Sequence, residues 1–452
     1  MKSRRWWLAL IGIVASMTLV AAACSSDDSD DSSGSDDSST DGTTPSGDAN
    51  ALAGMKGTTP LVELSDEFKN RMLETDPALV DFNYGPESYD AVIISALAIE
   101  EAGTDGAAYS DKINGITRGG EKCTNYADCL ALVKAGTDID YDGASGPLEF
   151  SGNGEPTEAS YGILEFGNTG CEETKECIDD SKTTYVSATA PSSADVPQET
   201  TTATREGDGT FVVGTLLPET GSLAFLGPPE FAGVNLAVEE INAAGGVLGN
   251  DVTHIQGDSG DTENGVAPGT VDTLLGQNVD IIVGAASSSV SLSVIDKIVN
   301  AGVVMFSPAN TSKKFSDYND NALYFRDAPS DILQGQVLAD TVLGDSNANV
   351  YVLALNDDYG TGLLDDFTSS LEDGGGKVVG NSVYDPKAAD FSAEVEDAKG
   401  ASPDAIVIIG FDETSRILTT MIEQGIGPSD LSVYGVDGNM GNALAENFEA
   451  GT

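Results

Sequence analysis

The second half of the chain alternates short apolar runs with helix-length segments, and this pattern constrains the fold more than any other feature. Gly209–Leu217 predicts a buried strand, and Pro229–Ala244 predicts a helix with one apolar face and a stop at the two glycines that follow. Continuous apolar strands separated by helices are typical of parallel sheets covered on both faces, so we expect a doubly wound α/β fold. Further strands are predicted at Val279–Val283, Val303–Phe306, Val350–Leu355, Lys377–Tyr384, Ala405–Ile409 and Ser432–Val436.

The first half of the chain holds elements that cannot form a core alone. Leu52–Thr58 predicts a strand and Tyr89–Ala102 a strong helix, and Pro147–Phe150 and Ser160–Phe166 predict short strands. These strands are too few to close a core around that helix. The series in the second half meanwhile stops after a helix predicted around Asn442–Phe448. We therefore expect the first half to complete the sheets of the second.

The N-terminus has the composition of an export signal. Three basic side chains lie within the first five residues, and an apolar run follows from Trp6 to Ala23. That run is short for a bilayer crossing, which takes roughly 20 residues. We expect residues 1–23 to be a signal peptide. Val20–Cys24 resembles a bacterial lipobox, which implies cleavage and acylation of Cys24; a plain signal peptide cut nearby is the alternative.

Residues 24–50 are rich in Ser, Asp, Gly and Thr, which predicts a disordered acidic stalk. The whole chain has a formal net charge of −53, from 74 Asp plus Glu and 21 Lys plus Arg. Such a charge opposes binding to nucleic acid or to an anionic membrane surface. We therefore expect membrane attachment through the lipid anchor only, at the outer face of the cell membrane.

Besides Cys24, the chain has four cysteines in two close pairs, Cys123 with Cys129 and Cys171 with Cys177. An exported chain meets an oxidising compartment, so we expect two small disulfide loops. Four cysteines are enough ligands for a metal, but they lack paired CxxC spacing and no histidine lies near them. We expect no metal site and no cofactor.

Five segments of the second half together resemble the type I periplasmic binding proteins, specifically the leucine/isoleucine/valine-binding branch. They are Gly233–Gly249, Asp280–Ser289, Val304–Thr311, Asp358–Gly362 and Asp390–Ser392. The resemblance spans nearly all of Gly207–Thr452 and resumes at Ser88–Ala91 and Gly146–Phe150, which are similar to the family's last third. It implies two doubly wound parallel-sheet lobes joined by a hinge, in circularly permuted order.

In that order, residues 51–178 correspond to the family's C-terminal part and contribute to both lobes. Residues 179–208 form a linker between the family's original ends, residues 209–327 form lobe 1, and residues 328–452 form lobe 2. A rearranged chain that never folds and a fragment of a longer tandem array are the competing interpretations.

The resemblance implies an amino acid held between the lobes by groups at strand ends. Its carboxylate would be bound by the Ser287 hydroxyl, by main-chain N–H groups of Ala309, Asn310 and Thr311, and by the Thr311 hydroxyl. Its ammonium would face Tyr359, Phe411 and Asp437. Such ends of parallel strands are where doubly wound sheets bind ligands.

Each of these side chains has a structural alternative. Ser287 and Thr311 could cap helices, Tyr359 and Phe411 could pack in the core, and Asp437 could belong to an ordinary turn. Arg326 and Asp331 lie where lobe 1 ends and lobe 2 begins, and we expect them to form an ion pair near the hinge.

The resemblance implies a lipid-anchored solute-binding protein that captures a branched-chain or similar amino acid and delivers it to an ABC permease. A ligand-sensing receptor domain of the same fold is the alternative. An enzyme is disfavoured: the one histidine, His254, rules out an HExxH motif, and Ser287–Ser289 lacks the GxSxG elbow. We expect a monomer.

Overall fold

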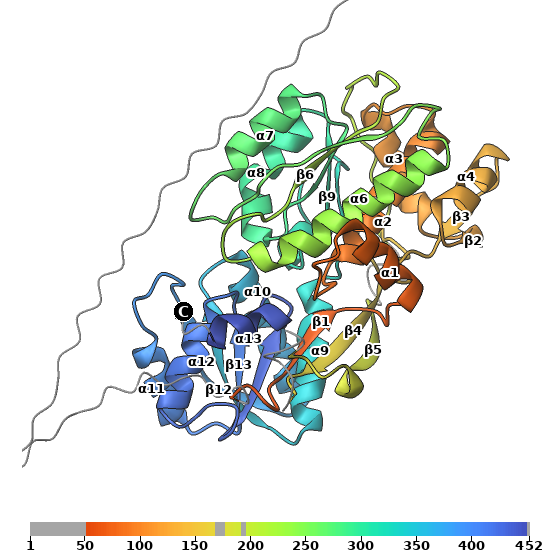
Figure 1. Ribbon diagram of the computed structural model, residues 1–452. Coiled ribbons are helices and arrows are strands. Elements are labelled where there is room, and N and C mark those ends of the chain that lie inside the picture. The colour runs from red at the N-terminus through yellow and green to blue at the C-terminus, as the bar shows by residue number, and fades with distance from the viewer. Residues whose placement is uncertain (1–50, 168–176, 191–195, 450–452) are drawn as a thin grey trace, which may run out of the picture. The chain divides into compact units, whose positions relative to one another are not determined.

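The computed structural model describes residues 51–167, 177–190 and 196–449 (Figure 1). Its strands form a seven-stranded, a five-stranded and a two-stranded sheet. We call the seven-stranded sheet, with the helices that pack on it, the seven-stranded half. The five-stranded sheet with its helices is the five-stranded half.

The five-stranded sheet is parallel throughout and has the order β10-β9-β8-β6-β7. Its strands are β6 (Val212–Leu216), β7 (Thr253–Ile255), β8 (Ile281–Gly284), β9 (Val304–Ser307) and β10 (Tyr324–Arg326). Between them run α6 (Gly227–Ala243), α7 (Ala267–Gly276), α8 (Ser288–Asn300) and the short 3-10 helices η3 (Ala224–Leu226) and η4 (Lys313–Phe315). The alternation predicted for this part of the chain is confirmed.

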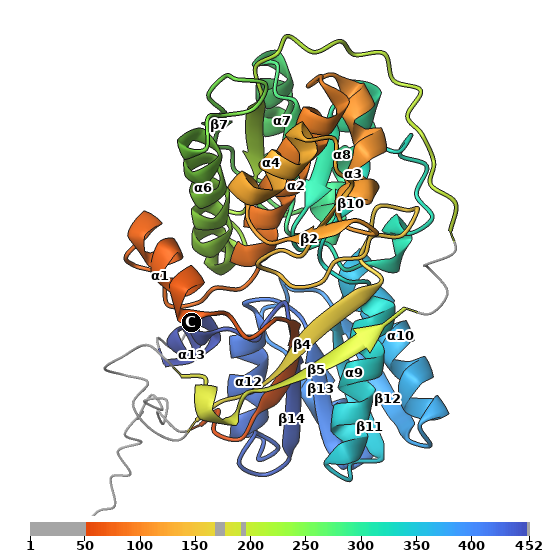
Figure 2. The ribbon, with the colours of Figure 1, turned by 90° about the vertical axis from the view of Figure 1, so that its right-hand side faces the viewer.

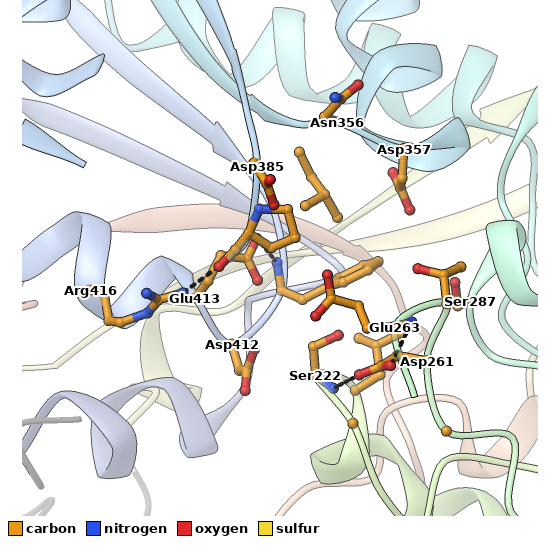
Figure 3. Close-up of a pocket in the computed structure, with 17 residues that line it drawn as sticks. Ser222, Asp261, Glu263, Ser287, Asn356, Asp357, Asp385, Asp412, Glu413 and Arg416 are labelled. Atoms are coloured by element: carbon orange, nitrogen blue, oxygen red, sulfur yellow. Dashed lines mark hydrogen bonds between the residues drawn. The ribbon is translucent and has the colours of Figure 1, made fainter. Parts of the chain in front are cut away.

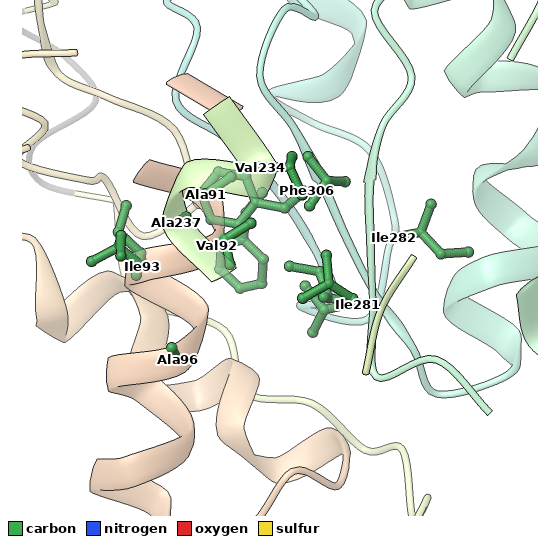
Figure 4. Close-up of a cluster of buried hydrophobic side chains, with 14 of the residues drawn as sticks. Ala91, Val92, Ile93, Ala96, Val234, Ala237, Ile281, Ile282 and Phe306 are labelled. Atoms are coloured by element: carbon green, nitrogen blue, oxygen red, sulfur yellow. The ribbon is translucent and has the colours of Figure 1, made fainter. Parts of the chain in front are cut away.

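Helix α2 (Gly85–Ala102), from the first half of the chain, packs inside the five-stranded half (Figure 4). It is buried along most of its length, which suits a helix that is apolar on nearly every side. It begins earlier than the predicted Tyr89, because Pro86 is favourable in a first helical turn. Its contacts join Ala91, Val92, Ile93 and Ala96 with Val234 and Ala237 of α6 and with Ile281 and Phe306 of the sheet.

The first half also supplies a small group of elements beside α2. These are α1 (Asp66–Thr75), η1 (Ala107–Tyr109), α3 (Ser110–Ile116), β2 (Glu121–Cys123), α4 (Tyr126–Lys134) and β3 (Ile139–Tyr141). A disulfide joins Cys123 in β2 to Cys129 in α4, as the sequence predicts. Cys24 and Cys171 lie outside the described residues, so lipidation and the second disulfide, to Cys177, stay predictions.

The seven-stranded sheet has the order β12-β11-β13-β14-β1-β4-β5. Its strands are β1 (Lys56–Pro60), β4 (Glu158–Glu165), β5 (Thr184–Thr189), β11 (Asn349–Leu355), β12 (Lys377–Tyr384), β13 (Ala405–Ile409) and β14 (Ser432–Val436). Its helices are α9 (Asp331–Gly344), α10 (Asp358–Asp373), α11 (Ser392–Ala401), α12 (Thr414–Glu423) and α13 (Asn442–Glu449). In the described part of the chain, no helix has the length and apolar character needed to cross a membrane.

The first described strand of the chain pairs with the last. β1 lies parallel to β14, with Lys56 opposite Tyr434 and Thr58 opposite Val436. β4 then pairs antiparallel with the other edge of β1. The first half of the chain therefore adds strands to the seven-stranded sheet and packs the helix α2 in the five-stranded half.

Two expectations about local structure are wrong, and a segment predicted as a linker contains regular structure. The seven-stranded sheet is not wholly parallel, because β4 and β5 run antiparallel to their neighbours. Pro147–Phe150 makes only an isolated bridge at Phe150, since Glu149 has a left-handed backbone (φ 43°) that breaks the extended run. The predicted linker 179–208 contains η2 (Asp180–Lys182) and β5, and Val186 and Ala188 of β5 pack toward α9 (Figure 2).

The close approach of α2 to α6 gives a first test of how the first half is integrated. A Cβ atom at Gly233 of α6 would lie 2.1 Å from the Gly85 carbonyl oxygen, whereas a Cβ at Gly269 of α7 would meet nothing within 4 Å. We expect Gly233→Ala to lower the free energy of unfolding by about 1 to 3 kcal/mol. Gly269→Ala, the matched control, should raise it by up to about 1 kcal/mol. Urea unfolding measures both, and a stabilising Gly233→Ala would contradict this packing.

Three carboxyl groups are buried together where α2, α6 and the crossover after β10 meet. Glu87, Glu230 and Asp327 are all buried, and neither oxygen of Glu230 or of Asp327 has a hydrogen-bond partner among the described residues. Burial raises the pKa of Glu87 to about 8, with a further contribution from Asp90. Burial and the Glu87 charge raise the pKa of Glu230 and of Asp327 as well. Carboxyls in such a setting favour the protonated form.

This cluster predicts a stability that falls as pH rises. The folded protein holds protons that the unfolded chain releases, so stability is lost between the ordinary pKa of Glu87, 4.5, and about 8. We expect Glu87→Gln to reduce the decrease in the free energy of unfolding across this pH range by on the order of 2 kcal/mol or more, since one pKa unit corresponds to about 1.4 kcal/mol. Chemical unfolding across this pH range tests the prediction. Glu67→Gln, at an exposed site on α1, is the control that should leave the profile unchanged.

Candidate functional site

The candidate site lies beyond the carboxyl ends of parallel strands from both halves. In the seven-stranded half, β13 and β14 end just before Phe411 and Asp437. In the five-stranded half, β8 and β9 end shortly before Ser287 and Thr311. Together they enclose a cavity of about 20 Å³, which we call the inner pocket. It is lined by Tyr84, Leu223, Leu226, Ala286, Ser287, Ser288, Ala309, Thr311, Tyr359, Phe411, Asp437 and Gly438.

Six of the seven predicted ligand-binding residues line this pocket, and Asn310 does not. The Asn310 amide donates to the carbonyls of Ala285 and Ala286, at 2.9 Å each, and its oxygen accepts from Tyr324 Oη at 3.0 Å. Its main-chain N–H donates to Ser307 Oγ at 2.9 Å, and that of Ala309 donates to the same oxygen at 3.3 Å. These two N–H groups are therefore engaged within the loop and do not face a ligand carboxylate as predicted.

Ser287 and Thr311 form the five-stranded side of the pocket. Ser287 is the N-cap of α8, and its hydroxyl accepts from the Val290 N–H at 3.4 Å, so the structural alternative applies to it. Its own O–H remains a donor beside the positive end of a helix, which favours anions. The Thr311 side chain is 1% exposed, lies near Asp331 and makes no well-formed hydrogen bond with another described residue.

Asp437 is the most heavily bonded side chain of the seven-stranded side. Its Oδ1 accepts from Tyr359 Oη at 2.7 Å and from Gln334 Nε2 at 2.8 Å, and its Oδ2 accepts from Tyr84 Oη at 2.8 Å. Burial raises the pKa of this carboxyl, and the hydrogen bonds that it accepts offset part of the rise. The Asp437 carboxylate is thus held in a fixed position in the wall of the pocket.

Two of the three partners of Asp437 were missed from the sequence. Tyr84 belongs to the first half of the chain and comes just before α2, with a left-handed backbone (φ 59°) that is uncommon outside glycine. Gln334 lies in α9, and its Nε2 also donates to the Thr58 carbonyl of β1 at 3.1 Å. The Gly85-Pro86 start of α2 was the available signal for Tyr84, because it places the residue at a helix end rather than inside a loop.

Tyr359 and Phe411 form an aromatic wall. Their rings are stacked, with centroids 5.4 Å apart and an interplanar angle of 12°. Tyr359 Oη also accepts from the Gly438 N–H at 3.3 Å. An aromatic face beside a fixed carboxylate is an arrangement that suits a cation.

The predicted ion pair between Arg326 and Asp331 is wrong. Arg326 is buried and pairs with Glu155, with its Nε 3.1 Å from Oε2 and its Nη2 on the same oxygen. Its Nη1 donates to the carbonyls of Asn310 and Ser312, at 3.1 and 2.9 Å, so Arg326 fixes the loop that carries Thr311. Glu155 lies in the first half of the chain, 171 residues from Arg326, and no local pattern marks it as the partner.

Asp331 is instead fully buried near Asp437, and neither of its oxygens has a partner of good hydrogen-bond geometry among the described residues. Burial and the nearby Asp437 charge raise its pKa well above the ordinary range.

In the described residues, no group of three or more His, Cys, Asp or Glu side chains is arranged to hold a metal ion.

A larger cavity of about 520 Å³, which we call the outer chamber, adjoins the inner pocket (Figure 3). The two share Leu223, Ser287 and Phe411. Contacts between the two halves flank this region: Ser289 Oγ donates to Asp357 Oδ2 at 3.0 Å, and Lys387 Nζ lies 3.0 Å from Glu263 Oε1. The remaining walls are Gly221, Ser222, Gly260, Asp261, Thr262, Glu263, Leu355, Asn356, Asp357, Asp385, Pro386, Asp412, Glu413 and Arg416.

Comparison with protein families finds a match of residues 210–449 to the family described as periplasmic binding protein. This match covers more than half of the chain, and the predicted resemblance is confirmed. It leaves out the first half, which supplies β1, β4 and α2.

Curated relatives include Leu/Ile/Val-binding protein homolog 3 of Brucella melitensis, 29% identical over 47% of this chain and 57% of that protein. Leu/Ile/Val-binding protein homolog 2 of Brucella abortus is 29% identical over 54% of this chain and 65% of that one. The chain thus spans less than two thirds of the length of either relative.

Among solved structures, the branched-chain amino acid transporter substrate binding protein LivJ of Streptococcus pneumoniae, in complex with isoleucine, is 28% identical. The structural match covers 53% of this chain and 67% of the LivJ chain, with a TM-score of 0.48. The leucine binding protein LivK of Thermotoga maritima is 23% identical, with the same coverage and the same TM-score.

The buried Arg326–Glu155 pair predicts a strong effect on stability. Removing one partner of a buried pair costs about 3 to 5 kcal/mol, because the other charge stays buried without compensation. We expect a loss of this size for Glu155→Gln in urea unfolding. Glu101→Gln breaks the exposed pair with Lys112 and should cost about 1 kcal/mol or less. Equal losses for the two variants would show that Glu155 does not hold Arg326 in the folded protein.

Proposed function

Because the chain belongs to the periplasmic binding protein family, we propose that it is a solute-binding protein that captures an amino acid, branched-chain or similar, between its two halves. The observation that carries this proposal is the pairing of opposite chemistry across the inner pocket. A fixed carboxylate, Asp437, lies on one side, and hydroxyl donors at a helix N-terminus lie on the other. The names of the Leu/Ile/Val-binding relatives support the same ligand class.

The two ends of an amino acid fit these two sides. We propose that the Ser287 and Thr311 hydroxyls bind the ligand carboxylate, together with the main-chain N–H groups of Thr311 and of the start of α8. A helix N-terminus and free hydroxyl donors favour that anion. On the opposite side, Asp437 accepts from the ammonium and the stacked Tyr359 and Phe411 cover it. Asn310 supports the loop rather than touching the ligand.

The inner pocket is too small for an amino acid in this arrangement. Its volume of about 20 Å³ holds roughly one water molecule. The two halves therefore have to part before the ligand enters and close again over it. Such hinge motion is the usual way in which a ligand stabilises a closed two-lobed protein.

The circularly permuted order remains part of the proposal. Residues 51–178 would correspond to the family's C-terminal part, 179–208 to the bridge between its original ends, 209–327 to lobe 1 and 328–452 to lobe 2. The parallel pairing of β1 with β14 supports this order, because it joins the first half to the end of the matched region.

We also propose that the protein is exported and anchored to the outer face of the cell membrane through Cys24, with residues 24–50 as a stalk. There it would deliver its ligand, as a monomer, to an ABC permease. The acidic composition of the stalk supports an extended tether.

Isothermal titration with a panel of amino acids tests the proposed function. We expect one class of amino acid to bind, and Ser287→Ala to weaken its binding by at least about tenfold, or 1.4 kcal/mol. Asp437→Asn should weaken it as much, since it removes the charge that faces the ammonium. Ser293→Ala, on the exposed face of the same helix α8, is the matched control and should bind like the unaltered protein. If no amino acid binds, the proposal fails.

A further inference from the structure

The outer chamber has an unusually one-sided charge. Its walls carry one guanidinium, that of Arg416, and six carboxylates: Asp261, Glu263, Asp357, Asp385, Asp412 and Glu413. Because the chamber shares Ser287 and Phe411 with the inner pocket, it is the space into which a ligand side chain would extend from an amino-acid head group. This inference rests on one part of the proposed function, the capture of an amino acid between the two halves, and it replaces the branched-chain class of ligand with another.

Several of these carboxylates have ordinary structural roles. Asp261 accepts from the N–H groups of Glu263 and Asn264 in a turn, and Asp357 caps α10. Glu263 pairs with Lys387. An acidic wall of this kind would by itself indicate nothing more than an acidic protein.

Glu413 differs, because only one of its two carboxylate oxygens is hydrogen-bonded within the described part of the chain. Its Oε1 accepts from the Phe411 N–H at 3.0 Å and from Tyr384 Oη at 2.7 Å. Its Oε2 is buried and has no partner among the described residues, and the residue is 3% exposed. A buried polar oxygen without a partner costs free energy that a bound donor would recover. Glu413 belongs to the chamber wall (Figure 3), and a turn of its side chain would bring Oε2 to a donor in the chamber.

Arg416 does not supply that donor, because its guanidinium is committed elsewhere. Its Nη1 donates to the Ala388 carbonyl at 2.9 Å and its Nη2 to the Pro386 carbonyl at 2.5 Å. The same group lies over the Phe391 ring, 5.0 Å from its centroid. Burial raises the pKa of Asp412 despite this neighbouring positive charge.

We propose that the outer chamber binds the cationic end of the ligand, so that the captured solute is a basic amino acid, with its ammonium or guanidinium group donating to Glu413 Oε2. Phe411, which lines both cavities, covers the aliphatic part of the ligand side chain. A branched-chain ligand would leave the chamber filled with water and Glu413 Oε2 without a charged partner.

Neutral isosteres provide the sharpest test. Titration calorimetry on the full chain compares arginine with its neutral isostere citrulline, and lysine with norleucine, which keeps the four-carbon side chain of lysine and lacks its terminal ammonium. We expect each basic member to bind at least about tenfold more tightly than its neutral partner. We expect the difference to shrink as salt is added, since screening weakens such contacts.

Variants assign the effect to the chamber. Glu413→Gln and, on the exposed rim, Asp385→Asn should each reduce the ratio of arginine to citrulline affinity. Asp373→Asn, at the exposed end of α10, is the control that should leave this ratio unchanged. Thermal unfolding of each variant checks that it is folded, and the rim variant tests the inference even where Glu413→Gln does not fold.

The outcomes separate this inference from the proposed function. Equal or tighter binding of citrulline, norleucine or leucine overturns the cationic preference and leaves the proposed function intact. Binding of agmatine, which lacks the carboxylate, without binding of arginine supports the chamber and overturns capture of an amino acid. Failure of every amino acid and of agmatine to bind overturns both.

Discussion

The parallel pairing of β1 with β14 is the contact on which the rest of the structure depends. It seats the first half of the chain against the end of the second and carries the seven-stranded sheet on to β4 and β5. The Gln334 side chain joins the same strand to the site, since its amide donates to the Thr58 carbonyl of β1 and to Asp437. Sheet order and pocket geometry are therefore set by one junction.

The first half contributes to the site at two further points, and each places a polar side chain where the second half needs one. Tyr84 donates to Asp437, and Glu155 neutralises Arg326, which in turn holds the loop that ends at Thr311. Both contacts are buried, where an unpaired charge or hydroxyl is costly. The first half is thus part of the candidate site and not an appendage to it.

The sequence predicted most strands and the helices α2, α6 and α13, because β11 to β14 and α6, for example, each carry a strong apolar pattern over their own length. It failed where structure depends on partners far along the chain. β5 was assigned to a linker because its composition is Ser- and Thr-rich, and it becomes a strand only by pairing with β4. Glu155 had no local signal of its role, and the signal available for Tyr84 was the Gly85-Pro86 start of α2. For the site, the predicted strand ends were enough to locate the pocket. They did not show which N–H groups face it, because two of the predicted ones donate to the Ser307 hydroxyl instead.

The junction of β1 with β14 also sets the order in which the protein can fold. Tyr84 and Asp437 are 353 residues apart in sequence, so the site closes only after β14 has become available to β1. Closing so long a loop is slow, and until then β1 and β13 present unpaired edges that favour association with other chains. Within the described residues, the seven-stranded sheet is therefore the part of the molecule most open to such association until β1 and β14 have paired.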